Sequence, residues 1–152
     1  MTEPRPLLII GYGNPSRGDD ALGPRLIDWL ERDTSLPDGY DTLTDFQLQI
    51  EHALDLRGRR RVLFIDASLN APAPCRLTPL AARRDPSYTS HALSPEALLD
   101  VYRQVCPEPP PACQLLAVRG YRFELGEALS PQAEANAEAA KTLIRRLLRD
   151  AD

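Results

Sequence analysis

Three ionisable side chains are spaced so that they could meet at one edge of a sheet and do metal-dependent or acid–base chemistry. Asp20 follows the apolar run LLII and the turn GYGNPSRGD, Asp66 comes directly after RVLFI, and His91 lies in YTSHALSPE. In an open α/β sheet the ligand crevice lies beyond the carboxyl ends of the strands, so we expect all three there. Two aspartates and one imidazole form an open ligand set for nickel, zinc, manganese or iron, with water or substrate completing the shell.

Each of these residues also has an ordinary structural alternative. A carboxylate at the end of a buried strand is costly unless it gains a cation, a donor or water, so Asp66 could simply accept backbone N–H groups from the next turn. His91 could be a surface histidine near a helix start. The doublet Asp19–Asp20 precedes a helical pattern, where aspartate is a common N-cap. We expect Asp19 to cap the helix and shape the turn, while Asp20 faces the crevice.

Other kinds of site have less support in the sequence. The segment GYGNPS supplies G-x-G, but Ser16 stands where the dinucleotide fingerprint has its third glycine, and no Walker lysine follows. No G-x-S-x-G nucleophile elbow is present. Cys75, Cys106 and Cys113 lack CxxC spacing and are expected to be free thiols in a reducing cytosol. His52, beside acidic residues in QIEHALDL, is expected on the surface.

The elements that must position these residues alternate between strands and helices. Continuous apolar runs predict buried strands, and apolar residues repeating about every 3.6 positions predict helices. The expected strands are Leu7–Ile10, Tyr40–Leu48, Arg61–Ile65 and Gln114–Val118, with a short candidate at Cys75–Thr78; the expected helices begin at Ala21, Ile50, Ser94 and Ser130. This order predicts a single domain over residues 1–152, an α/β/α sandwich with a mostly parallel, twisted sheet between two helix layers.

Composition excludes several classes of partner. The chain has 152 residues, with 18 basic and 22 acidic side chains and a net charge of −4, which argues against nucleic acid as the main partner. No apolar stretch approaches the roughly 20 residues that span a bilayer, so we expect no membrane association. The start MTEPRPLLII lacks the apolar core and cleavage site of a signal peptide. We therefore expect a cytoplasmic protein.

The segment GYGNPSRGDDALGPRLIDWL resembles the opening signature of the hydrogenase maturation proteases, the nickel-dependent endopeptidases that finish the large subunit of NiFe hydrogenases. The family pattern is a strand, G-x-G-N, a spacer, D-D/E-x-x-G and an amphipathic helix. It continues with a strand ending in aspartate and alanine, here FIDAS, and with a histidine before a later helix, here TSHALSP. The similarity extends through RGYRFELGEALSP to the final helix, and so covers nearly the whole chain.

The resemblance implies a five-stranded sheet between helices and a cytosolic enzyme without a permanently bound cofactor. It also implies that Asp20, Asp66 and His91 bind metal. One segment departs from the family pattern: many members carry Asp-Gly-Gly after the second strand, whereas here Phe46 and Gln47 follow Asp45. Similar FQL segments occur in members that serve NAD-reducing hydrogenases, so the resemblance points to that subtype.

The function that the resemblance implies is removal of a C-terminal extension from the large-subunit precursor after nickel insertion. Nickel supplied by the precursor would be the recognition element, bound by Asp20, Asp66 and His91. Hydrolysis could use nickel to polarise the scissile carbonyl, or a carboxylate to orient the attacking water. A nonenzymatic factor that docks on the same nickel site is the alternative of a different class.

Overall fold

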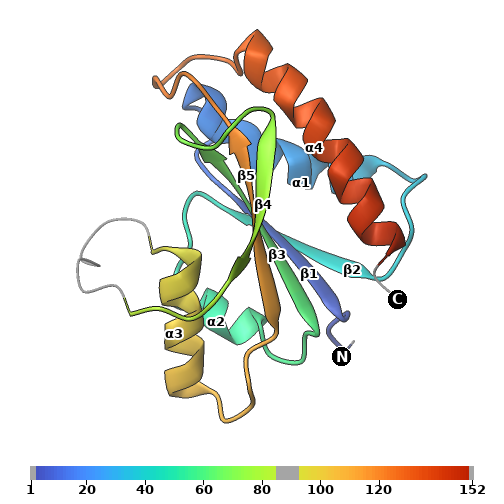
Figure 1. The fold of residues 1–152 in the computed structure, drawn as a ribbon, viewed down its shortest axis with the longest axis vertical. Coiled ribbons are helices and arrows are strands. Elements are labelled where there is room, and N and C mark those ends of the chain that lie inside the picture. Colours follow the sequence, from blue (N-terminus) through green and yellow to red (C-terminus); the bar gives the residue numbers. More distant parts are fainter. Residues whose placement is uncertain (1–2, 85–92, 151–152) are drawn as a thin grey trace.

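The computed structural model describes residues 3–84 and 93–150. It shows a five-stranded sheet with helices on both faces (Figure 1). In chain order the elements are β1 (Leu7–Tyr12), the 3-10 helix η1 (Gly18–Ala21), α1 (Leu22–Arg32), β2 (Tyr40–Asp45), α2 (His52–Asp55), β3 (Arg61–Ser68), β4 (Cys75–Leu80), α3 (Pro95–Val105), β5 (Ala112–Arg119) and α4 (Pro131–Arg149). The predicted α/β class is confirmed.

The strands are ordered β2-β1-β3-β5-β4. The neighbours among the first four are parallel, and β4 runs antiparallel to β5 at the edge of the sheet. Such an antiparallel edge strand is common on an otherwise parallel sheet. Because the first four strands share one direction, their carboxyl ends meet at a single edge, and this edge is where polar side chains can gather.

Two apolar clusters fix the helix layers. Successive side chains of a strand point to opposite faces, so Leu7 and Ile9 belong to the cluster covered by α1 and α4. Leu8 and Ile10 belong to the cluster covered by α2 and α3. Figure 1 shows the same division, with α1 and α4 together on one side of the sheet and α2 and α3 on the other. Every residue of β1 is buried, as expected for a central strand covered on both faces.

The two predicted Ser-Pro helix starts are confirmed. The Ser94 hydroxyl accepts the N–H of Ala97 at 3.1 Å, and the Ser130 hydroxyl accepts the N–H of Ala133 at 3.2 Å. In each case proline follows as the first helical residue, where its missing N–H costs nothing. The starts of both helices are therefore set by Ser-Pro pairs that can be recognised in the sequence.

The second strand is shorter than predicted, ending at Asp45 instead of Leu48. Beyond this point two side chains accept hydrogen bonds from the backbone. The Phe46 N–H donates to the Asp45 carboxylate at 2.7 Å, and the Gln49 N–H donates to His52 Nδ1 at 2.8 Å. Local bonds of this kind compete with a strand ladder. The expected helix from Ile50 is reduced to the single turn α2 for the same reason.

Gly23 lets α1 lie directly against the ends of two strands. A Cβ atom on this residue would stand 2.5 Å from the Tyr12 carbonyl oxygen and 3.0 Å from that of Ile65. We expect Gly23→Ala to lower the free energy of unfolding by about 3 kcal/mol, measured by urea denaturation, because backbone must shift to admit the methyl group. In an open helix the same change would stabilise by up to about 1 kcal/mol, so a stabilised variant would contradict this close packing.

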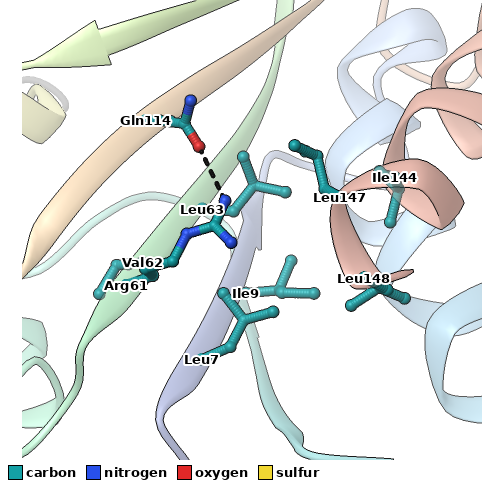
Figure 2. Close-up of a pocket in the computed structure, with 9 residues that line it drawn as sticks. All are labelled: Leu7, Ile9, Arg61, Val62, Leu63, Gln114, Ile144, Leu147 and Leu148. Carbon is teal, nitrogen blue, oxygen red and sulfur yellow. Dashed lines mark hydrogen bonds between the residues drawn. The ribbon is translucent and has the colours of Figure 1, made fainter. Parts of the chain in front are cut away.

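A small cavity lies between α4 and the sheet (Figure 2). Leu7, Ile9 and Leu63 line it from the strands, and the Arg61 guanidinium donates to the side-chain oxygen of Gln114 at 3.3 Å across its rim. Its volume of about 10 Å³ leaves room for no more than one water molecule. It also lies toward the amino ends of β1 and β3, away from the edge where the predicted site residues gather. The cavity is a packing defect, not a ligand site.

Within residues 3–84 and 93–150, none of the helices is both long enough and apolar enough to cross a membrane.

Candidate functional site

Asp20 is held at the carboxyl end of β1 by the turn that precedes η1. The backbone N–H of Asn14 donates to the Asp20 carboxylate at 2.7 Å, and the N–H of Gly13 donates to the Asp45 carbonyl at 3.0 Å. Gly13 has φ +147°, and a Cβ there would collide with the Asp20 carbonyl oxygen. The N–H groups of Gly13 and Asn14 in the GYGN turn therefore donate to protein oxygens, one of which belongs to a carboxylate. In a phosphate loop such N–H groups point at the bound anion instead.

Asp19 has a different role from the predicted one. Neither Arg17 nor Ala21, the residues at the starts of η1 and α1, makes a side-chain cap, and the Asp19 carboxylate points away from both helix starts to groups far along the chain. It accepts the backbone N–H groups of Tyr121 at 2.7 Å, Arg122 at 3.1 Å and Ser130 at 2.7 Å, and the Ser130 hydroxyl at 2.8 Å. The prediction that Asp19 caps the first helix is wrong.

The buried Asp19 carboxylate ties η1 to the loop after β5 and to the start of α4. The side chain is fully buried. Burial acts to raise its pKa, but the hydrogen bonds from Ser130, Tyr121 and Arg122 outweigh this and lower the pKa of Asp19 below its ordinary value. A carboxylate with four donors is a satisfied buried charge, and it fixes the backbone that carries Asp20 next to it.

Asp66 lies near the carboxyl end of β3, on the face of the sheet covered by α3. The register pairs Ile10 with Phe64 and Gly11 with Ile65, so the next pair along these neighbouring strands is Tyr12 and Asp66. The Tyr12 hydroxyl and the Ala67 N–H lie near enough to the Asp66 carboxylate to act on its pKa. The strand continues to Ser68, three residues beyond the predicted end at Ile65.

The electrostatics place Asp20 and Asp66 around the same space. Burial, followed by the negative charge of Asp20, raises the pKa of Asp66 to about 7, against smaller opposing effects of the Tyr12 hydroxyl and the Ala67 N–H. The structure thus brings together two of the three predicted site residues at the expected edge of the sheet.

His91, the third predicted site residue, lies outside the described residues. The described chain resumes at the buried Leu93 and enters α3 at Pro95, so the segment leads to the start of that helix. Glu96, in the first turn of α3, acts electrostatically on Tyr12, which shows that the start of α3 lies beside the site. Across residues 3–84 and 93–150, no group of three or more His, Cys, Asp and Glu side chains is arranged to hold a metal ion. A third protein ligand would have to come from elsewhere.

Sequence reasoning missed Tyr12. The segment GYGNPS predicts a glycine-rich turn at this position, whereas Tyr12 is the last residue of β1 and only 7% exposed. Burial, followed by the charge of Asp66, raises the pKa of Tyr12 well above its ordinary value, so the hydroxyl stays a donor. The alternation along the strand could have placed Tyr12 on the same face as Leu8 and Ile10, but its neighbour on β3 depends on register.

The structure also corrects the expectation for His52. Its side chain is only 13% exposed, with Nε2 3.4 Å from the Asp45 carboxylate and Nδ1 accepting the Gln49 N–H. Since Nδ1 accepts, the neutral imidazole carries its proton on Nε2 and directs it at Asp45. The Asp45 carbonyl in turn accepts the Gly13 N–H, so this pair links the segment after β2 to the turn that holds Asp20. No signal in the sequence joins these two residues.

The arrangement is suited to cation binding or to proton transfer. The Asp20 carboxylate is oriented by the Asn14 N–H, and the Asp66 carboxylate is largely removed from solvent close to it. A divalent cation between them would replace the proton that Asp66 otherwise retains near neutral pH. With a pKa of about 7, Asp66 is also poised to accept a proton from water at neutral pH.

Comparisons with known proteins agree with this geometry. No protein-family model matches the sequence. The chain is 28% identical over 149 residues to the hydrogenase 2 maturation protease of Escherichia coli K12, covering 95% of this chain and 91% of that protein. The solved structure of the hydrogenase maturating endopeptidase HybD from E. coli superposes with a TM-score of 0.74 at 25% identity, covering 95% of this chain and 93% of that one.

A third comparison supports the fold. The NiFe hydrogenase maturation protease HycI from Thermococcus kodakarensis KOD1 superposes with a TM-score of 0.70, covering 94% of this chain and 92% of that one, at 19% identity. The alignments run along nearly the whole length of each protein. The chain is thus similar, along nearly its whole length, to proteases that mature NiFe hydrogenases.

Proposed function

We propose that this protein is an endopeptidase that removes a C-terminal extension from the large-subunit precursor of a NiFe hydrogenase after nickel insertion. The observation that carries the proposal is the pair Asp20 and Asp66, which face one space at the carboxyl edge of the sheet in a chain related to maturation proteases along 95% of its length. The protein would work in the cytoplasm as a single domain over residues 1–152, without nucleic acid or membrane as partner.

Asp20 and Asp66 would bind the nickel that the precursor already holds, and would recognise the precursor in this way. The two carboxylates support the proposal, because a divalent ion bound between them would offset two partly buried negative charges. Asp20 and Asp66 would supply one ligand each, and His91 stays the predicted third. No resident cofactor is needed when the substrate brings its own metal.

Hydrolysis needs a polarised carbonyl and an activated water. Nickel bound with the precursor would supply the Lewis acid for the scissile carbonyl. A carboxylate of this pair would orient the attacking water. The Asn14 N–H keeps Asp20 in one orientation while substrate enters.

The intact mass of the cognate precursor tests this proposal. Nickel-loaded and nickel-free precursor are incubated with the protein and analysed by mass spectrometry, with a precursor that lacks its extension as the blank. We expect loss of a C-terminal peptide from the nickel-loaded form alone. Stable binding to the loaded precursor without any mass loss would instead make the protein a nonenzymatic docking factor.

A further inference from the structure

We propose that the outer edge of β2 is the docking site for the C-terminal extension of the precursor, which adds to the sheet as an extended, antiparallel strand. This inference deepens the proposed function and rests on it. In the described part of the chain, β2 forms one edge of the sheet and pairs with β1 alone (Figure 1). An edge strand presents a row of backbone N–H and C=O groups to which an extended peptide can bind.

The backbone groups that β2 presents at its edge follow from its ladder with β1. The Asp45 carbonyl accepts the Gly13 N–H at 3.0 Å, so the backbone groups of Asp45 face β1. In a strand this direction alternates from one residue to the next. The N–H and C=O groups of Tyr40, Thr42 and Thr44 therefore face outward, where a further strand would pair with them.

The opposite edge of the described sheet is protected against such pairing. The Arg119 N–H donates to the Pro74 carbonyl at 3.1 Å, just before β4 begins, so the alternation directs the backbone of Pro79 away from β5. Proline has no N–H to offer, and it is a common protection of edge strands. β2 has the sequence YDTLTD, with neither proline nor lysine. It is therefore the edge that is open to an added strand.

A hollow of about 430 Å³ lies along the β2 edge. It is lined by Tyr40, Asp41, Thr42 and Leu43 from the strand and by Asp55 and Arg59 from α2 and the segment after it. The Arg59 guanidinium is bonded to the Asp41 carboxylate, which offsets its charge, whereas Asp55 adds a further carboxylate. The hollow has room for a side chain of an added strand, and its charge favours a neutral or basic peptide over an acidic one.

The β2 edge also leads to the proposed site. The strand ends at Asp45, whose carbonyl binds Gly13, and the next residue, Asn14, donates to the Asp20 carboxylate. Neighbouring strands lie about 4.8 Å apart, so a strand added to β2 is about 10 Å from β1, which about three extended residues can cross. A chain that is cut at the site and continues along β2 runs from Asp45 toward Tyr40, antiparallel to the strand.

The test uses the full-length protein with Thr42→Pro and, as the matched control, Thr42→Val. Proline removes one outward N–H and places its ring on the edge, whereas the ladder to β1 does not use this N–H. Valine keeps the N–H and loses only the hydroxyl, which donates to the Glu31 carboxylate at 2.8 Å. Thermal unfolding first establishes that both variants fold. Calorimetry then measures binding of the nickel-loaded precursor, and processing assays give kcat and KM.

We expect Thr42→Pro to weaken precursor binding and raise KM about 10-fold, with kcat within about twofold of the wild type. Thr42→Val should stay within about twofold in all three quantities. Equal binding and KM in the two variants would overturn the inference. A wild-type dimer that Thr42→Pro dissociates, without any change in precursor binding, would also overturn it, because the edge would then serve a second copy of this chain.

A second measurement leaves the protein unchanged and so does not depend on the folding of Thr42→Pro. Precursors with single proline substitutions, from about the fourth residue of the extension onward, are bound and processed by the wild type. Alternate N–H groups of an added strand face β2, so we expect binding to weaken about 10-fold at every second position and to change little between them. Absence of this alternation would overturn the inference. Alternation in binding without any cleavage would overturn the proposed function and leave the docking edge standing.

Discussion

Asp66→Asn should abolish processing of the precursor while making the metal-free protein more stable at neutral and higher pH. The folded protein raises the pKa of Asp66 from 3.8 to about 7, first through burial and then through the charge of Asp20. The protonated carboxyl is thus favoured in the folded state, and this contribution is complete below about pH 4 and lost as pH rises through about 7. The shift of roughly three units corresponds to roughly 4 kcal/mol.

Asparagine does not ionise in this range, so the free energy of unfolding of the variant should not fall as pH rises through about 7. Its side chain has nearly the same shape, and its oxygen can still accept hydrogen bonds. Urea denaturation at about pH 5 and about pH 8 measures the difference, which should favour the variant at the higher pH by up to about 4 kcal/mol. A variant that is less stable than the wild type at the higher pH, or that processes precursor normally, would contradict this role for Asp66.

Asp41→Asn supplies the matched control because it makes the same chemical change with the opposite expected sign. Burial acts to raise the pKa of Asp41, but hydrogen bonds from Arg59 and the Arg5 backbone outweigh it and lower the pKa. This ionised carboxylate stabilises the fold above its ordinary pKa, and the stabilisation is lost as pH falls through its lowered value. The control should therefore lose stability at the higher pH and keep its processing activity.

Asp19→Asn should destabilise the protein by about 3 kcal/mol or more, although it changes one atom. The Asp19 carboxylate accepts four hydrogen bonds in a fully buried place, and every partner there is a donor. An amide has only one oxygen, so its NH₂ group would face at least one of these donors. A buried donor left without its charged acceptor costs the desolvation penalty of that group, which is larger for a charged bond.

Asp20→Asn is the matched comparison for Asp19→Asn. Asp20 is the next residue, partly exposed, and accepts one backbone N–H that an asparagine oxygen could also accept. We expect this variant to unfold within about 1 kcal/mol of the wild type, as surface changes usually do, and to lose processing. Urea midpoints and slopes for the two variants separate the structural aspartate from the chemical one. Equal stability of Asp19→Asn and the wild type would contradict the buried network.

Features that depend on nearby residues were predictable from the sequence. The apolar runs of β1, β3 and β5 and the Ser-Pro starts of α3 and α4 are local signals, and all of them are confirmed. The short strand candidate from Cys75 is also confirmed, as the antiparallel edge strand β4. The end of β2 was not predictable, because it depends on where the Asp45 and His52 side chains find backbone partners.

Features that depend on distant residues were missed. The partners of Asp19 lie 102 to 111 positions further along the chain, so nothing in the doublet itself distinguishes a helix cap from a buried anchor. The nearness of Tyr12 to Asp66 depends on strand order and register, which the sequence does not state. The gathering of Asp20 and Asp66 at one edge was predictable because parallel strands must end together. Their role as ligands, and that of His91, stays a prediction.

The most direct test of the account is the single-turnover rate of peptide release from nickel-loaded precursor by Asp20→Asn, compared with the wild type and Asp28→Asn. Asp28 is an exposed aspartate on α1 whose ion pair with Arg32 is solvated, so its loss should matter little. We predict a loss of about 100-fold or more for Asp20→Asn and a rate within about twofold of the wild type for Asp28→Asn. A folded Asp20→Asn variant that releases the peptide as fast as Asp28→Asn would contradict the claim that the Asp20 carboxylate binds the nickel of the precursor.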